Sequence, residues 1–262
     1  MVNSLLGRVK CVVRNRIDRH RYPYLRITEL PSQRPSVESI YYFINQLGKH
    51  QPIGLTHEVA TGYHELPFPA LRFKTSRRDL QGRLDRLAAI QGLKGSYGLD
   101  IGCALGGLTF GLQQMGAKMI GIDRDNPSIT VAKECEALFK TGANFECASF
   151  SEEMLGYLAK SYGNPNTGKF DFAIWFSSFN WVAEALGMNK TRSLMRSLSE
   201  KADALIADSA IGGKGTNALS TIGVVSNETF VEFVMSSSTY TKVTQIGVDI
   251  DWYGRTVYRF FR

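Results

Sequence analysis

From Gly95 onward, short apolar runs alternate with stretches of helical periodicity, and this alternation limits the folds open to the chain more than any other feature. The apolar runs cover residues 97–101, 118–122, 144–148, 170–176 and 204–207, and the helical stretches cover residues 108–115, 127–140, 152–161 and 191–201. Strands joined through helices pair in parallel, and the helices then cover both faces of the sheet. We therefore predict a doubly wound α/β sheet for this part of the chain.

The C-terminal end departs from the alternation. A helical stretch over residues 228–235 is followed by two strand-like stretches, 242–248 and 255–261, with a short turn near 251–254 between them. Strands joined by a short turn pair antiparallel. The prediction is thus a seven-stranded, mostly parallel sheet that ends in an antiparallel hairpin.

The N-terminal part has no such alternation, and we expect it to be a mainly helical or irregular extension. Ser36 can cap a helix over residues 37–47 that Gly48 ends, and leucine spacing predicts another helix over 77–90. Between these helices, residues 49–74 carry prolines and glycines without any periodicity.

Near the N-terminus, residues 5–17 have the spacing of an amphipathic helix. Its apolar arc holds Leu5, Leu6, Val9, Val12, Val13 and Ile17. Two interpretations are open. The helix docks on the protein's own core, which we favour, or residues 1–21 lie on a membrane surface.

The positive charge is concentrated in the first third of the chain. Residues 1–90 carry 15 Lys/Arg and 7 Asp/Glu, whereas residues 91–262 carry 16 and 17. A basic segment favours an acidic partner such as RNA, a phospholipid or a phosphorylated substrate, although a solvated basic surface gives the same count. We divide the chain into a basic substrate-binding or lid module, residues 1–76, and a second domain, residues 77–262.

Composition excludes several classes of protein. Apolar residues make up 44% and charged residues 21%, which argues against disorder and repeat arrays. No apolar run approaches the ~20 residues that span a bilayer, and the first residues lack the pattern of a secretory signal. The four cysteines have no CxxC spacing, so we expect free thiols, no metal site and a cytoplasmic location.

The segment that carries chemistry is Gly98-Leu-Asp-Ile-Gly-Cys-Ala-Leu-Gly-Gly107, which follows the first strand and opens a helix. Glycines at such a turn let the backbone approach a ligand closely. Asp100 precedes the glycines, and Asp123 ends the second strand. A carboxylate at Asp123 can accept both hydroxyls of a ribose, and one at Asp100 can face an ammonium group. Together they suit a nucleoside that carries an amino acid.

These residues, with the terminal hairpin, make residues 77–262 resemble the class I S-adenosylmethionine-dependent methyltransferases. By that resemblance Asp100, Gly102 and Gly106 line the methionine end of S-adenosyl-L-methionine, and Asp123 holds its ribose. Ala104 stands where the family usually has a third small residue, commonly glycine. The expected cofactor contacts are completed by Cys103, Ala104, Arg124, Ser149, Phe150 and Phe176.

Two positions depart from the family. After the third strand, Ser149 replaces the usual acidic residue near the adenine, and Phe150 can stack on the base, unless both simply pack the loop. After the fourth strand, Asn180 and Trp181 stand where glycan and small-molecule O-methyltransferases often have two histidines. Asn180 can orient the acceptor. Trp181 can form one wall of the substrate cleft, or it can pack in the core.

A general base, if the acceptor needs one, has to come from elsewhere in the chain. His57 and His64 lie in the unperiodic N-terminal segment, which can fold over the cofactor as a lid. Their spacing suits no regular metal site. The glycine-rich loop 208–217 after the fifth strand is a second candidate lid.

The sequence therefore predicts a methyltransferase that uses S-adenosyl-L-methionine and a small-molecule, glycan or lipid-linked acceptor with a hydroxyl or amine. The alternative is an RNA methyltransferase that binds RNA through residues 1–90. Two less favoured alternatives are a non-catalytic methyltransferase-like binding protein and a dinucleotide-dependent oxidoreductase, and the second does not explain Asp100 or the hairpin.

Overall fold

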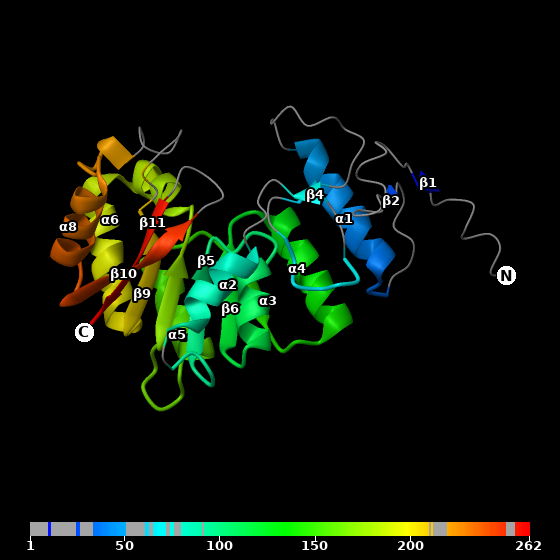
Figure 1. Ribbon diagram of the computed structural model, residues 1–262, viewed down its shortest axis with the longest axis horizontal. Helices are drawn as coiled ribbons and strands as arrows, with labels where there is room; N and C mark the ends of the chain where they lie inside the picture. Colours follow the sequence, from blue (N-terminus) through cyan, green and yellow to red (C-terminus); the bar gives the residue numbers. More distant parts are fainter. Residues whose placement is uncertain are drawn as a thin grey trace.

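A computed structural model gives the fold (Figure 1). It describes residues 10–11, 25–26, 34–50, 61–62, 65–71, 74–75, 80–90, 92–209, 211, 219–249 and 255–262.

The centre of the molecule is a seven-stranded sheet with the order β10-β11-β9-β8-β5-β6-β7. Its strands are β5 (Tyr97–Ile101), β6 (Lys118–Asp123), β7 (Asn144–Cys147), β8 (Phe172–Trp175), β9 (Ala204–Asp208), β10 (Lys242–Asp249) and β11 (Arg255–Phe261). Strands β5 to β9 are parallel, whereas β11 pairs antiparallel with both β9 and β10. The predicted fold class is confirmed. The chain leaves β5 for β6 on one side and later reaches β8 on the other, so the loops after β5 and β8 meet where open α/β sheets bind ligands.

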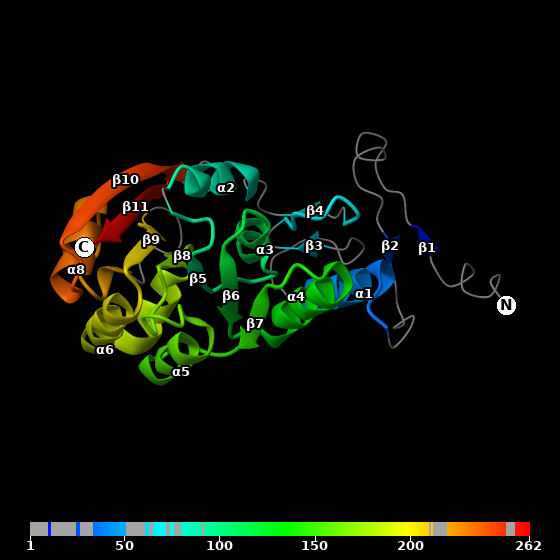
Figure 2. The same cartoon turned by 90° about the horizontal axis from the view of Figure 1, so that it is seen from below.

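Helices cover both faces of the sheet (Figure 2). One face carries α2 (Leu80–Ala88), α3 (Gly107–Gln114) and α4 (Asn126–Phe139), and the other carries α5 (Glu152–Tyr162), α6 (Phe179–Lys201) and α8 (Asn227–Ser237). Side-chain caps fix several helix starts. Asp125 accepts a hydrogen bond from Ser128 N, Ser151 from Met154 N and Ser226 from Thr229 N.

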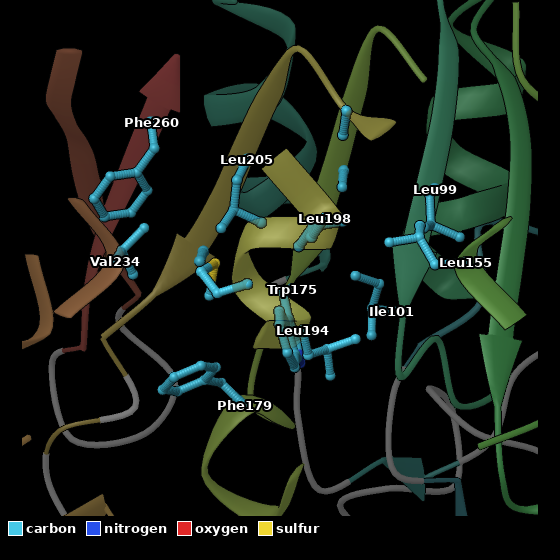
Figure 3. Close-up of a cluster of buried hydrophobic side chains, with 14 of the residues drawn as sticks. Leu99, Ile101, Leu155, Trp175, Phe179, Leu194, Leu198, Leu205, Val234 and Phe260 are labelled. Atoms are coloured by element: carbon cyan, nitrogen blue, oxygen red, sulfur yellow. The ribbon is translucent and has the colours of Figure 1, made fainter. Parts of the chain in front are cut away.

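The largest core cluster lies between the sheet and α5, α6 and α8 (Figure 3). Trp175 of β8 is fully buried at its centre. The edges of Phe150 and Phe179 pack against it, each with a ring-centroid distance of 5.1 Å. This packing anchors the residues that follow β7 and β8 to the rigid part of the fold.

Helix α1 and residues 65–71 of the N-terminal part share a core with the rest of the chain. Helix α1 (Val37–His50) packs on α4, and Ser39 Oγ donates to Glu134 Oε2 at 3.0 Å. Phe68 stacks on Phe139 of α4 at 4.0 Å and meets Phe110 of α3 edge-on. Short two-residue strands pair as β1 (Lys10–Cys11) with β2 (Leu25–Arg26) and β3 (Thr61–Gly62) with β4 (Lys74–Thr75).

Three expectations about elements are corrected. Lys10 and Cys11 form strand β1, which interrupts the helix expected over 5–17; the rest of that segment lies outside the described residues. The β-branched run around Cys11 suits a strand as well as a helix. Helix α1 continues past Gly48 to His50, because a glycine inside a helix costs only about 1 kcal/mol relative to alanine and does not by itself end it.

The third correction concerns the segment after β8. Helix α6 starts at Phe179, twelve residues before the predicted start at Thr191, and has a kink at Gly187, which has φ 72° and ψ 173°. The kink at Gly187 interrupts the spacing of apolar residues along the helix, and their helical periodicity is clear only after this glycine.

None of the helices within the described ranges is long and apolar enough to cross a bilayer. Three cysteines, Cys103, Cys135 and Cys147, are free thiols.

We predict that Phe68→Ala destabilises the whole domain. Phe68 is 5% exposed and joins the N-terminal segment to α3 and α4 through two ring contacts, so truncation should cost about 3–5 kcal/mol. Urea unfolding monitored by far-UV circular dichroism measures this change. Tyr157→Ala, at a half-exposed ring, is the control and should cost less than about 1 kcal/mol. A Phe68 variant as stable as the wild type contradicts the shared core.

Candidate functional site

The loop after β5 is held tightly against β6. The backbone N–H groups of Gly102 and Cys103 both donate to the Ile122 carbonyl, at 2.8 and 3.0 Å. Gly102 and Ala104 have φ values of 76° and 49°, in the left-handed region. Gly106 N closes the turn on Cys103 O at 2.8 Å, and α3 starts at the next residue. The glycines therefore shape a sharp turn whose N–H groups are already engaged.

Asp123 is the second attachment of this loop. Its Oδ2 accepts a hydrogen bond from Ala104 N and its Oδ1 accepts one from Asp125 N, both at 2.9 Å. An ionised carboxylate has about four lone-pair positions, so each oxygen can accept one further hydrogen bond. The side chain is held in one orientation at the tip of β6 and can bind two neighbouring hydroxyls.

Asp100 is a buried carboxyl in the middle of the site. It is 3% exposed, and Thr109 Oγ1 donates to its Oδ2 at 2.7 Å. Burial raises the pKa of Asp100 to about 6, and the nearby charge of Asp123 adds to the rise. The Thr109 hydrogen bond and the charge of Arg83 act in the opposite direction. A cation bound beside Asp100 would favour its ionised form.

Two other segments pack on the glycine loop. A methyl group at Gly102 would clash with Ser178 Oγ, 2.5 Å away, and one at Gly107 would clash with the Glu65 carbonyl oxygen. The loop after β8 and residues 65–71 of the N-terminal segment therefore approach the loop so closely that only glycine fits. The site is bounded by parts of the chain far apart in sequence.

The residues after β8 bring a hydroxyl and an amide to this edge. Ser178 Oγ donates to Ile101 O at 3.1 Å. Asn180, in the first turn of α6, is 2% exposed, and its Oδ1 has no hydrogen-bond partner among the described residues. Next to it, Trp181 is 54% exposed, which is unusual for so large an apolar side chain. Trp181 is thus not packed in the core.

Other predicted residues have mainly structural surroundings. The ring of Phe150 packs on Trp175, and buried Phe176 lies under the Arg83 guanidinium, 5.5 Å from the ring centroid. Burial raises the pKa of the Cys103 thiol well above its usual range, so this thiol is neutral. Roles for these three residues in cofactor binding stay predictions.

Ser149 and Arg124 are exposed beside the ends of β7 and β6. His57 and His64 lie outside the described residues, as does most of the loop 208–217. Asp208 itself is the last residue of β9 and fully buried, so it is not part of a lid.

Sequence reasoning missed Arg83, Thr109 and the buried pair of Asp208 and Arg255. Arg83 is 3% exposed in α2 and lies on the same helix face as Leu80, Leu84 and Leu87. A cation on an apolar stripe has to find a buried counter-charge, and that pattern was the available indication. Asp208 and Arg255 meet only through strand pairing, which local patterns do not reveal.

No protein-family model matches the chain. This chain is 29% identical over 113 residues to the O-antigen chain terminator bifunctional methyltransferase/kinase WbdD of Escherichia coli. The matched segment is 43% of this chain and 15% of that protein. A solved structure of the bifunctional kinase-methyltransferase WbdD superposes with a TM-score of 0.62 at 21% identity, covering 83% of this chain and 46% of the other. The structure of EvdMO1 superposes with a TM-score of 0.51 at 12% identity, covering 83% and 46%.

The chain thus spans less than half the length of each of these proteins. This chain has the fold of the class I S-adenosylmethionine-dependent methyltransferases.

Proposed function

We propose that the protein is a methyltransferase that binds S-adenosyl-L-methionine at the loops after β5 and β6. The observation that carries the proposal is the arrangement of two carboxylates on either side of the glycine turn. Asp123 keeps two acceptor positions for ribose hydroxyls, and Asp100 is a buried carboxyl whose raised pKa a bound ammonium group would lower. The cofactor offers a ribose diol and an ammonium group with matching chemistry.

The proposed acceptor is a hydroxyl of a glycan or another small molecule, with an amine or a lipid-linked acceptor as variants of the same reaction. The relative's name, an O-antigen chain terminator with methyltransferase activity, supports a glycan. When bound, the cofactor supplies an activated methyl group, so the protein mainly has to align the reactants. Asn180 Oδ1 can accept a hydrogen bond from the acceptor, and the exposed Trp181 ring can form one wall of its cleft.

A hydroxyl acceptor also has to lose a proton. His64 directly precedes Glu65, whose carbonyl contacts the glycine loop, and this adjacency supports His64 as a base ahead of His57. RNA as the acceptor remains the alternative, supported only by the positive charge of residues 1–90.

We expect S-adenosylhomocysteine to bind the protein and Asp123→Ala to weaken binding about 100-fold or more. The variant removes charged acceptors for two hydroxyls and frees Ala104 N. Isothermal titration calorimetry measures the dissociation constants. Asp203→Ala, an exposed aspartate before β9 at the opposite edge of the sheet, is the matched control. Binding of NADH in place of S-adenosylhomocysteine would support an oxidoreductase, and binding of neither would contradict the proposal.

We expect affinity for S-adenosylhomocysteine to fall as the pH drops through about 6. Asp100 then takes up a proton and no longer attracts the ligand ammonium group. Because the folded-state pKa of Asp100 lies above the ordinary value of 3.8 for an aspartate, the folded protein binds more protons than the unfolded chain between these two values. Asp100 ionisation thus lowers stability as pH rises from about 4 to 6.

The variant Asp100→Asn separates these two effects. It should raise stability at pH 7 by about 2–3 kcal/mol, remove the pH dependence of stability in that window, and weaken ligand binding. Thermal unfolding and calorimetry across pH 4.5–8 measure both. Unchanged affinity in this variant would show that Asp100 does not face the ligand.

The acceptor class can be tested with S-adenosylmethionine labelled in its methyl group. We expect transfer to polysaccharide fragments or small hydroxylated metabolites, and none to RNA or phospholipid vesicles. Asn180→Ala and Trp181→Ala should reduce transfer about tenfold or more while the affinity for S-adenosylhomocysteine changes little. Label in RNA alone would replace the glycan proposal with its alternative.

A further inference from the structure

A buried carboxylate at the end of β9 binds the loop that follows β8. Asp208 Oδ1 accepts a hydrogen bond from Ser177 N at 2.9 Å, and Oδ2 accepts one from Ser177 Oγ at 3.2 Å. Oδ2 also accepts a hydrogen bond from Arg255 Nη1 at 3.3 Å. Asp208 therefore connects Ser177, the second residue after β8, with Arg255, the first residue of β11.

The charges of this cluster are withdrawn from water. The Asp208 side chain is 0% exposed and that of Arg255 is 7% exposed. Burying a charge is unfavourable unless it is paired and hydrogen-bonded, and apolar side chains of similar size would often stabilise the fold equally well. A buried pair of this kind at the ligand edge of the sheet suggests a requirement for a defined geometry.

The geometry in question is that of Ser177. Its φ of 60° is in the left-handed region, which is unfavourable for a residue with a side chain because its Cβ comes close to the following carbonyl oxygen. Both its backbone N–H and its hydroxyl are held by the same carboxylate, which compensates for this cost. The turn at Ser177 then directs Ser178 to Ile101 O and against Gly102, and α6 begins at the next residue.

We propose that Asp208 and Arg255 are positioning residues for methyl transfer. Through Ser177 they fix the loop that sets Ser178 against the glycine turn and brings Asn180 and Trp181 to the acceptor side. Neither residue contacts the reactants. Strand β11 of the C-terminal hairpin, which starts at Arg255, thereby controls the geometry of a loop far from it in sequence. This inference rests on the proposed function.

The test is hydrogen–deuterium exchange of the intact, ligand-free protein carrying Arg255→Met. We expect exchange in residues 176–181 to become about tenfold faster or more, because Asp208 loses its counter-charge and its hold on Ser177 N weakens. Strand β5 should exchange as in the wild type. Arg255→Lys, which keeps the charge, should restore most of the protection. Arg262→Met is the matched control, since Arg262 pairs with Asp203 at the other end of the same two strands.

Faster exchange across the whole sheet, or unchanged exchange in residues 176–181, would overturn the proposal. If Arg255→Met does not fold, Asp208→Asn serves in its place, because the amide oxygen still accepts from Ser177 N while the charge is lost. In the transfer assay, Arg255→Met and Asp208→Asn should each lower kcat about tenfold or more. Each should leave the affinity for S-adenosylhomocysteine within about threefold of the wild-type value. Lost affinity together with lost exchange protection in β5 would indicate a general structural role and also contradict it.

The exchange measurement needs neither cofactor nor acceptor. If S-adenosylhomocysteine does not bind the wild-type protein, the proposed function fails while the exchange result still decides whether the pair fixes the loop. The two failures are therefore distinguishable.

Discussion

The site depends first on the attachment of the glycine turn to the tip of β6. Three successive N–H groups, those of Gly102, Cys103 and Ala104, are bound by Ile122 O and the Asp123 carboxylate. The turn is consequently fixed in the ligand-free protein, so ligand binding carries no entropic cost of ordering it. The same bonds orient Asp123, so one interaction shapes both the loop and the carboxylate proposed to hold the ribose.

A second constraint is electrostatic. Asp100 and Asp123 share one edge of the sheet, and Asp100 is buried, so its pKa rises to about 6. Arg83 of α2 is buried, and its charge compensates for this rise only in part. In the ligand-free protein the site therefore holds more negative charge than its surroundings stabilise. A ligand with an ammonium and a sulfonium group would relieve that excess, whereas the phosphates of a dinucleotide would increase it, and this favours the methyltransferase proposal over an oxidoreductase.

The elements that the sequence predicted well are those whose information is local. The strands from β5 to β9 and the glycine turn follow from apolar runs, periodicity and glycine spacing within short windows. Helix α6 was predicted only beyond Gly187, because its first turns mix the exposed Trp181 with buried Asn180. The packing of Phe150 on Trp175 and the approach of Glu65 to Gly107 depend on tertiary contacts, which no local pattern contains.

The topology of the sheet determines which residues each strand contributes to the edge that carries the site. The parallel strands β5 and β6 end in the turn and the carboxylates proposed for the cofactor, and the antiparallel β11 adds Arg255 at the same edge because its direction is reversed. A parallel strand in that position would place its first residue at the opposite edge, away from Asp208. The antiparallel direction of β11 therefore matters for the site, because only a reversed strand in this position can begin beside the loop after β8. In this fold, the direction of the last strand places Arg255 beside Asp208 and so beside the loop that follows β8.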